Sequence, residues 1–403
     1  MKNNNLIVLA VIILFFTINL AEIVSNGQAI DNELDIKKFN NNPKKLSLLS
    51  PRYILGEKDE GLHQNNIFKM QEWWYYNVYF NDNESELKNW SIVISFSVYS
   101  NGCGLKLGIY NDENKSYNYK KTLNRNSFKY NAPGVNCSFN NSSYVIGRYP
   151  KWKIYAEFNA SNNNIISINL TFEANSLPMW ILKNTGHNRS NSYFGYYCIM
   201  NCNAYGDIFL NNTTYNVSGI GYHDHTWAPL DLNKPKFKTS IKQIKIKKSK
   251  FLDIYKSWDW LCIHFENGWD MFIGKIYSEK RNIFSKFTPG ALCFSPNGKK
   301  LYEQHFFLLE YTEKINSSIP NIEIPTKIHI KALFLNTLGY NLLKGPILLD
   351  FYYEAKNIQE GLHGNPPYWG IFQSQGKIYG TAKSLGKTIN LNGWAIAETT
   401  NYF

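Results

Sequence analysis

The 403-residue sequence predicts an all-β protein made of two antiparallel β-domains packed together. From about residue 70 to the C-terminus, apolar residues alternate with polar ones in short segments separated by Asn, Gly and Ser. Beyond the N-terminal leader, the sequence has no long amphipathic run of helical period. Many short strands at close spacing are typical of β-sandwiches and β-barrels.

The N-terminus predicts export. Lys2 precedes an almost unbroken apolar run, Leu6 to Ala21, which is short for a spanning helix of about 20 residues. Residues 1–26 are therefore predicted to be a signal peptide or N-terminal anchor, and residues 27–44 a polar linker. The mature protein is expected to be secreted or held in the cell envelope, outside the cytoplasmic membrane. Abundant Asn-x-Ser/Thr sequons, such as that at Asn89, fit an exported glycoprotein.

Strands are predicted in both halves of the chain. We place a first β-domain at 45–235 and a second at 250–403. The alternating segments lie at 90–100, 151–160, 164–174, 269–278, 304–313, 326–335, 346–356 and 387–400.

A lysine-rich stretch, residues 234–256, lies at the expected domain boundary. Strict alternation over residues 244–247 favours a strand with a solvated lysine face, or a protected edge strand. The alternative is a basic patch that binds anionic lipid or nucleic acid. Aromatic residues are not interleaved here as stacking platforms, so no nucleic-acid partner is expected. Membrane-surface association stays open for this chain of formal net charge +12, and its oligomeric state is not predicted.

The six cysteines leave two alternatives. Their even number and the predicted export are compatible with one or more disulfides. Isolated, buried and reduced thiols are the other alternative.

The segment GIGYHDHTWAP, residues 219–229, concentrates the side chains that could carry chemistry. In a strand, Tyr222, Asp224 and Thr226 share one face, whereas His223, His225 and Trp227 share the other. Burial among aromatic residues would raise the pKa of Asp224 and make it a general acid, with Tyr222 as its hydrogen-bonding partner. We therefore predict Asp224 and Tyr222 as catalytic residues.

The histidine face offers a second chemistry, metal binding. A site would need a further ligand, such as His264, His305 or a carboxylate, and no spacing marks one. We expect no metal, and we expect His223 and His225 to brace the strand as structural support.

Aromatic residues near these motifs are candidates to bind a substrate. Trp258 and Trp260 share a strand face, with Asp259 opposite. The predicted substrate-binding residues are Trp74, Tyr76, Tyr197, Trp227, Trp258 and Trp260. The sequence has no GxSxG, Walker, HExxH or dinucleotide signature, which disfavours the commonest hydrolases, nucleotide enzymes and dehydrogenases. No cofactor is expected.

Several motifs, in order and spacing, resemble the hydroxyneurosporene synthase and AttH-like family, which includes carotenoid and kievitone hydratases and decalin-forming cyclases. They are QEWWYYNVYF, GIGYHDHTWAP, SWDWLCIHFENGWDMFIGKI, PPYWG and LNGWAIAETT. The resemblance covers about residues 45–403. It implies two lipocalin-like domains with a mostly apolar pocket where they meet, and a Tyr-x-Asp pair whose aspartate protonates a C=C bond. Tyr222 and Asp224 match that pair. Gly195 and Tyr197 stand where the family's His-x-Trp would fall, so a carotenoid substrate is not carried over.

Together these observations predict a protein that acts on a hydrophobic, isoprenoid- or lipid-like small molecule in an interdomain pocket. The reaction would be a cofactor-free hydration, isomerisation or cyclisation. The alternative is a non-catalytic lipid-binding carrier or envelope protein. A carboxyl of Asp224 inside an enclosed, aromatic-walled cavity would favour chemistry, and one tied into backbone hydrogen bonds outside any cavity would favour the carrier.

Overall fold

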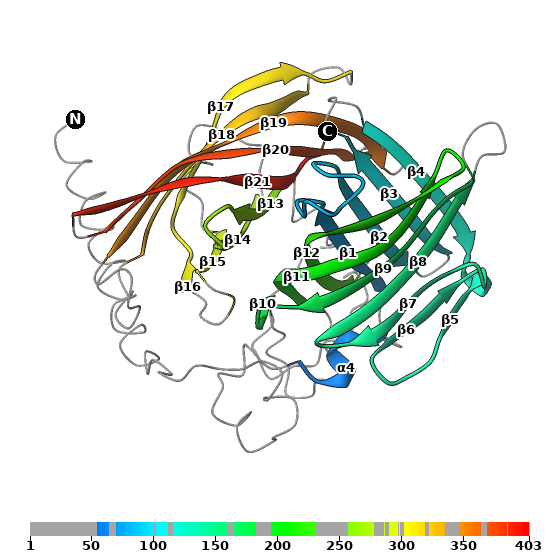
Figure 1. The fold of residues 1–403 in the computed structure, drawn as a ribbon. Helices are drawn as coiled ribbons and strands as arrows, with labels where there is room; N and C mark the ends of the chain where they lie inside the picture. The colour runs from blue at the N-terminus through cyan, green and yellow to red at the C-terminus, as the bar shows by residue number, and fades with distance from the viewer. Residues whose placement is uncertain are drawn as a thin grey trace, which may run out of the picture.

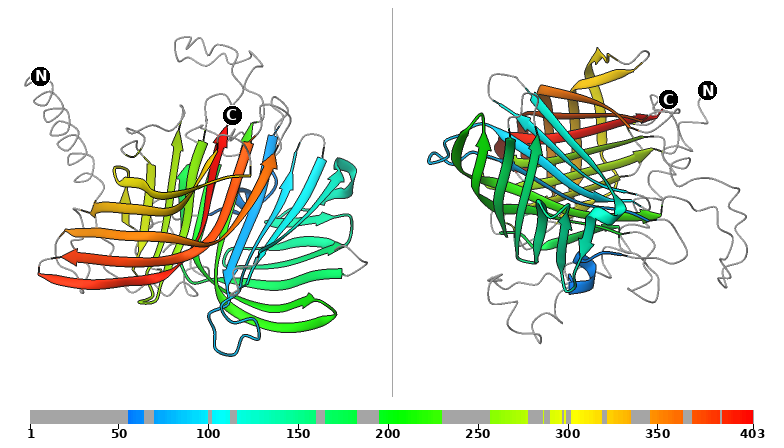
Figure 2. Two further views of the ribbon diagram at one scale, coloured as in Figure 1. Left: turned by 90° about the horizontal axis from the view of Figure 1, so that it is seen from above. Right: turned by 90° about the vertical axis from the view of Figure 1, so that its right-hand side faces the viewer.

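The fold is nearly all β, and its strands form two antiparallel sheets that lie side by side (Figures 1 and 2). The computed structural model describes residues 55–63, 70–99, 102–111, 116–159, 165–182, 195–229, 257–277, 286, 290–296, 298, 302–318, 322–334, 346–363, 369–384 and 386–402. Every strand pairing in these ranges is antiparallel, with two short helical turns, α4 (Glu57–Glu60) and η2 (Arg125–Ser127). The predicted all-β fold of two packed domains is confirmed.

The first sheet is a nearly closed barrel, drawn from blue to green in Figure 1. Its order is β4-β3-β2-β1-β12-β11-β9-β8-β7-β6-β5, and β10 also pairs with β11. The strands are β1 (Met70–Tyr79), β2 (Ser91–Val98), β3 (Gly102–Tyr110), β4 (Ser116–Asn124), β5 (Phe128–Tyr130), β6 (Val135–Phe139), β7 (Ser143–Arg148), β8 (Lys151–Asn159), β9 (Ile165–Ala174), β10 (Pro178–Leu182), β11 (Gly195–Leu210) and β12 (Thr213–Pro229).

The second sheet is a half-barrel, drawn from yellow-green to red in Figure 1, with the red strands in its middle. Its order is β16-β15-β14-β13-β21-β20-β19-β18-β17. The strands are β13 (Ser257–Phe265), β14 (Asp270–Tyr277), β15 (Gly290–Ser295), β16 (Tyr302–Gln304), β17 (Leu308–Asn316), β18 (Glu323–Phe334), β19 (Ile347–His363), β20 (Trp369–Ser384) and β21 (Lys387–Tyr402). Each alternating segment predicted from the sequence overlaps a strand. The largest differences are at β19, which continues to His363, and at 304–313, which begins in β16 and continues into β17.

The hairpin β11–β12 sets the register of the strand that carries Asp224. Leu210 pairs with Thr213, which leaves a two-residue turn at Asn211 and Asn212. Both asparagines have positive φ, 52° and 62°, as a type I′ turn requires, and asparagine tolerates this conformation better than most residues. Local turn chemistry therefore determines which β12 residues face each side of the sheet.

A bulge in β11 changes which of its side chains lie on the same side as Asp224. The pairing runs from Ile199 with His223 to Cys202 with Gly221, so β11 carries one extra residue there. Cys198 consequently faces the second domain, whereas Cys202 points into the barrel core. The alternation of β12 itself is uninterrupted through this region.

Three apolar clusters account for most of the packing. One fills the first barrel and includes Trp152 and Phe172, and a second fills the half-barrel around Phe351. The third joins side chains of both sheets and includes Tyr222 and Trp260. Since this third cluster is buried between the domains, the interface is an apolar core of its own.

All six cysteines are buried and free, which favours the reduced alternative. Several predicted features lie outside the described residues: the leader (1–26), the linker (27–44) and the lysine-rich stretch (234–256). The predicted domain boundaries at 45, 235 and 250 also lie there. Within the described part of the chain, no helix is long and apolar enough to cross a membrane.

Candidate functional site

Asp224 lies on the face of β12 that is turned toward the second domain. In the sheet it pairs with Cys198 on one side and Tyr75 on the other. Its side chain is buried, 4% exposed, at the edge of the cluster that joins the two sheets. As the alternation predicts, Tyr222 shares this face.

Hydroxyl groups hold one oxygen of the Asp224 carboxyl. Tyr222 donates to Oδ2 over 2.9 Å, and Tyr196 donates to the same oxygen over 3.2 Å. The indole of Trp260, from β13, donates in turn to the Tyr196 hydroxyl over 2.7 Å. The other oxygen, Oδ1, is buried without a hydrogen-bond partner among the described residues. The carboxyl is thus oriented by side chains rather than by the backbone, and one oxygen stays available.

Burial raises the pKa of Asp224 from its ordinary 3.8 to about 8. The hydrogen bonds from Tyr222 and Tyr196 oppose this rise, and the negative charge of Glu398 adds to it. At neutral pH the side chain is therefore a carboxylic acid that retains a proton.

The second domain contributes aromatic rings and a further carboxyl. The ring of Trp260 makes edge contacts with Tyr75 and Tyr222, both at 5.3 Å between centroids. Trp258 donates its indole N–H to Glu398 Oε1 over 2.9 Å. Glu398 is half-buried and pairs with Trp260 in the sheet; burial raises its pKa, against the opposing effect of Lys106.

Polar contacts fix how the two sheets meet beside this site. Tyr110 donates to Gln373 Oε1 over 3.2 Å, and the same glutamine donates to the Tyr75 hydroxyl over 3.4 Å. Ser91 donates to Gln375 over 2.6 Å. Because directional bonds between buried groups add to the apolar packing, the position of Trp260 relative to Asp224 is well determined.

The other face of β12 points into the first barrel. His223 donates from Nδ1 to the carbonyl of Tyr75 over 3.0 Å, and its Nε2 lies 3.4 Å from the Tyr197 hydroxyl. Burial lowers the pKa of His223 to about 3, so its ring is neutral. These bonds to a strand and to a core tyrosine suit a structural role.

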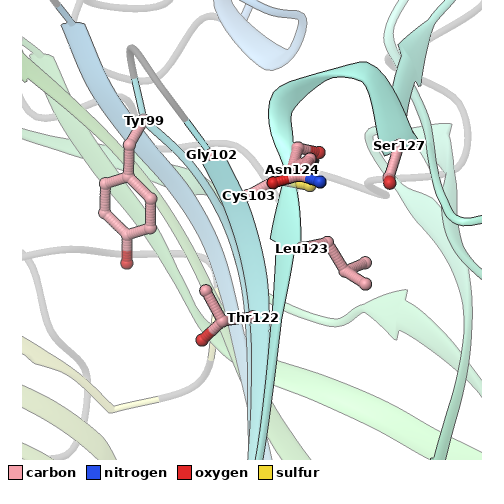
Figure 3. A pocket seen from close by; sticks show the side chains of 7 residues that line it. All are labelled: Tyr99, Gly102, Cys103, Thr122, Leu123, Asn124 and Ser127. Atoms are coloured by element: carbon pink, nitrogen blue, oxygen red, sulfur yellow. Dashed lines mark hydrogen bonds between the residues drawn. The ribbon is translucent and has the colours of Figure 1, made fainter.

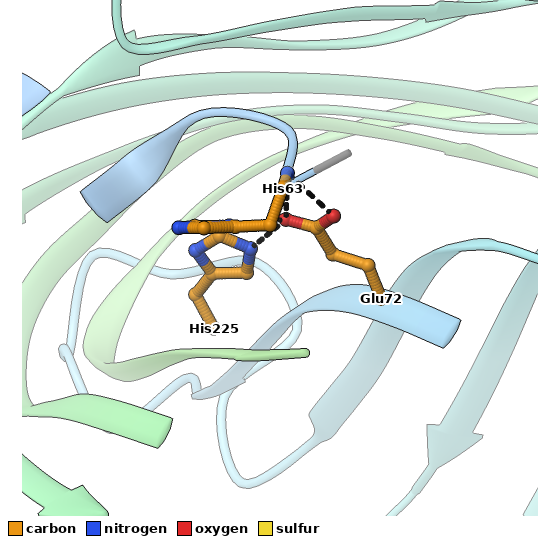
Figure 4. Close-up of side chains that lie close together, drawn as sticks. All are labelled: His63, Glu72 and His225. Atoms are coloured by element: carbon orange, nitrogen blue, oxygen red, sulfur yellow. Dashed lines mark hydrogen bonds and ion pairs between the residues drawn. The ribbon is translucent and has the colours of Figure 1, made fainter. Parts of the chain in front are cut away.

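His225 meets a carboxylate that the sequence spacing did not mark. Its Nε2 lies 2.8 Å from Glu72 Oε1, and His63 Nδ1 lies 2.9 Å from the same oxygen (Figure 4). The residues considered as a third ligand lie elsewhere: His264 bonds Asp270 over 2.7 Å, and His305 is exposed.

Four of the predicted substrate-binding residues lie on this barrel face and do not meet Asp224. Trp74, Tyr76, Tyr197 and Trp227 are buried in the barrel, where Trp74 stacks on His225 and Tyr76 on His223. Their ligand contacts stay a prediction. The structure brings Trp258 and Trp260 to the interface side instead, because β13 turns these two residues toward the first domain.

Gly195 explains one departure from the family pattern. A Cβ atom there would lie 2.2 Å from the ring of Trp227, so no histidine fits at this position beside that tryptophan. The neighbouring Tyr196 lies on the opposite face of the sheet, where its hydroxyl donates to Asp224.

Sequence reasoning missed Tyr196, Tyr75 and Glu398 as members of the site. Tyr196 and Tyr75 belong to aromatic runs, YFGYYC and EWWYY. Each run contains several tyrosines, phenylalanines or tryptophans, so the sequence does not distinguish the one that contacts Asp224. Glu398 lies in LNGWAIAETT, a motif noted for its resemblance only. The signal that could have found it is a carboxyl in an otherwise apolar strand segment.

A separate hollow lies near the ends of β3 and β4 (Figure 3). Its volume is about 420 Å³, and its lining is Tyr99, Gly102, Cys103, Thr122, Leu123, Asn124 and Ser127. None of the residues around Asp224 lines it. With one aromatic ring in its wall, it does not match the aromatic site predicted for a hydrophobic molecule.

Fold and site together define a class: a two-domain lipocalin-like β-protein with a buried acid where the domains meet. Solved structures share this architecture. An AttH-like protein from Nitrosomonas europaea has a TM-score of 0.58 and 12% sequence identity, over 88% of this chain and 99% of that chain. Kievitone hydratase from Nectria haematococca has a TM-score of 0.54 and 12% identity, over 86% of this chain and 93% of that chain.

CghA has a TM-score of 0.50 and 9% identity, over 87% of this chain and 97% of that chain. Comparison of the sequence with protein-family profiles and with curated proteins gives no match. The predicted resemblance is thus confirmed in the structural neighbours, at the level of the fold.

Proposed function

We propose that this protein catalyses the cofactor-free, acid-initiated conversion of a hydrophobic unsaturated molecule, with Asp224 as the proton donor. The expected substrate class is isoprenoid- or lipid-like. Hydration, isomerisation and cyclisation share the same first step, transfer of a proton to a C=C bond. Kievitone hydratase is by name a hydratase, which supports hydration as the first outcome to test.

The observation that carries this proposal is the asymmetry of the Asp224 carboxyl. Tyr222 and Tyr196 hold Oδ2, whereas buried Oδ1 has no partner among the described residues. A proton on Oδ1 would not be shared with another described side chain. A general acid needs this geometry, a fixed carboxyl with one unshared O–H.

The reaction would proceed in two steps. The π electrons of the C=C bond take the Asp224 proton to form a C–H bond, which leaves a carbocation and the aspartate anion. The faces of the surrounding tyrosine and tryptophan rings would stabilise the cation. Water then adds to the cation and returns a proton to Asp224. Alternatively, the Asp224 anion takes a proton from a carbon next to the cation, which gives the isomerised C=C bond. In a cyclisation, a second C=C bond attacks the cation and closes the ring, and the new cation then loses a proton to Asp224.

The competing function is a carrier that binds the same class of molecule without turnover. The apolar interface is compatible with it. The side-chain hydrogen bonds of Asp224 favour chemistry instead, because a purely structural aspartate is commonly tied to backbone N–H groups.

An isotope experiment separates the two. The purified full chain is incubated in D2O with a panel of polyprenyl alcohols and unsaturated fatty acids, and the products are analysed by mass spectrometry. Catalysis adds carbon-bound deuterium, with or without the mass of water. We expect Asp224→Asn to lose at least about 100-fold in rate, as the removal of a general acid does.

Asp207→Asn is the matched control, since Asp207 is exposed on the neighbouring strand β11. Its rate should equal that of the unaltered protein. Compounds that bind yet are recovered without deuterium would support the carrier. Extraction of lipid from the purified protein, followed by native mass spectrometry, identifies what it holds.

We also propose that the protein is exported, on the strength of the leader pattern at residues 1–26. Mass spectrometry of the N-terminus of protein recovered from outside the producing cell tests this. An intact leader on protein confined to the cytoplasm would contradict it.

A further inference from the structure

Three metal-ligating groups converge at one end of the first barrel, beside α4 (Figure 4). His63 Nδ1, Glu72 Oε1 and His225 Nε2 all lie within 4.8 Å of one another. They come from separate parts of the chain: the short segment after α4, the start of β1 and the end of β12. In the ranges that the structure describes, no other group of three such ligands is found.

We propose that His63, Glu72 and His225 bind a divalent transition-metal ion, Zn²⁺ in the first instance. Two imidazoles and one carboxylate are a zinc ligand set that leaves a fourth position for water. Mg²⁺ and Ca²⁺ prefer all-oxygen sites, so they are not expected here. Ligands of a tetrahedral zinc at about 2.0–2.1 Å stand roughly 3.3 Å apart. Each imidazole nitrogen, now 2.9 Å or 2.8 Å from Glu72 Oε1, therefore needs to move from that oxygen by only about half an ångström.

The hydrogen bonding of His225 points independently to a cation. Its Nδ1 lies 3.1 Å from the carbonyl oxygen of Asp59, which can only accept, so this nitrogen carries the hydrogen. Nε2 lies 2.8 Å from the Glu72 oxygen, which also accepts, so this contact needs a positive charge between the two atoms, either a second proton on the imidazole or a metal ion. A metal ion between them would satisfy both atoms. The bond from Nδ1 to a backbone carbonyl is also the usual support of a metal-bound histidine.

The surroundings hold these groups in place. The ring of Trp227 stacks on His63 at 3.6 Å between centroids, and Trp74 stacks on His225 at 4.9 Å. The backbone N–H of His63 also donates to Glu72 Oε2 over 2.9 Å. Since few side-chain rotamers have to be ordered on binding, a metal ion would tie the segment 55–63 to both strands at little entropic cost.

This proposal does not depend on the role of Asp224. The Asp224 and His225 side chains lie on opposite faces of β12, one toward the second domain and one inside the barrel. A test of metal binding therefore does not depend on which substrate the protein takes, or on whether Asp224 is catalytic.

The test is a titration of tag-free, chelator-treated full chain with Co²⁺, followed by its visible absorption, and then with Zn²⁺. We expect one Co²⁺ per chain, displacement by one Zn²⁺, and a higher thermal unfolding midpoint with Zn²⁺ than in chelator. His225→Gln and His63→Gln should each weaken binding by at least about 100-fold, more than loss of an outer-shell partner does.

His264→Gln is the control, because His264 is an equally buried imidazole that bonds a single carboxylate, Asp270. Its affinity for Co²⁺ should be unchanged. If the unaltered chain does not bind Co²⁺ stoichiometrically, the proposal is overturned and no variant is needed. Undiminished Co²⁺ binding by His63→Gln also overturns it. His63 lies outside the strands, in the short segment after α4, and its side chain is 10% exposed against 0% for His225, so that variant is expected to fold even if His225→Gln does not.

Discussion

Glu72 and Asp224 are both buried carboxyls on the paired strands β1 and β12, yet their pKa values move in opposite directions. Glu72 is 1% exposed and Asp224 4%. Burial raises the pKa of both, but around Glu72 the His63 and His225 rings outweigh it and lower the pKa to about 2. Asp224 has only neutral tyrosine hydroxyls as hydrogen-bond donors, and its pKa rises to about 8.

Burial alone does not decide the pKa of these two carboxyls. Their hydrogen-bonding and charged neighbours determine whether the group is an ionised carboxylate, as at Glu72, or a candidate acid, as at Asp224. On the barrel face, two imidazoles and a backbone N–H surround Glu72. On the interface face, the sheet offers Asp224 hydroxyl groups and aromatic rings. One strand therefore carries two kinds of chemistry on its two sides.

The largest expected effect is on stability. Glu72→Gln should lower the free energy of unfolding by about 3–5 kcal/mol, because it breaks a buried hydrogen-bonded ion pair and leaves the imidazoles without their acceptor. Asp224→Asn should raise it at pH 7, because folding no longer requires an aspartate to be protonated. Urea unfolding of both variants in chelator measures this. Equal destabilisation of the two would contradict the comparison.

The next effect is a pH dependence that belongs to Asp224. Its folded pKa, about 8, is above its ordinary 3.8, so its favourable contribution is complete below pH 3.8 and is lost as pH rises through 8. The stability gained from Asp224→Asn should therefore grow by about 1.4 kcal/mol per pH unit between those values and level off above. Unfolding measured at several pH values gives this slope. A flat difference would mean that Asp224 is ionised in the folded protein.

The smallest effect sharpens the role of the tyrosines. Both hydroxyls donate to the Asp224 carboxyl and favour its charged form, so Tyr222→Phe combined with Tyr196→Phe should raise its pKa further, by about one unit. The carboxyl stretching band of Asp224 in infrared difference spectra, identified by its loss in Asp224→Asn, follows the titration. A pKa that falls in the double variant would show that the tyrosines instead stabilise the protonated form.

Several features of the fold could be predicted before any coordinates. Alternation over residues 219–229 places Tyr222 and Asp224 on one face and His223 and His225 on the other, because successive side chains of a strand point to opposite sides. The Asn-Asn turn that precedes β12 is also local chemistry. Periodicity and turn residues act over a few positions, so they can be read from the chain directly.

Only the tertiary structure decided which residues complete each site. Tyr196, Trp260 and Glu398 reach the neighbourhood of Asp224 through strand pairing and domain packing, and the bulge in β11 switches which residues of that strand share its side. Likewise, Glu72 and His63 meet His225 from 153 and 162 positions away in the chain. Long-range pairing depends on the free energy of the whole fold, which no local pattern encodes. The sequence by itself therefore determined the strands and their faces, and packing determined the chemistry on each face.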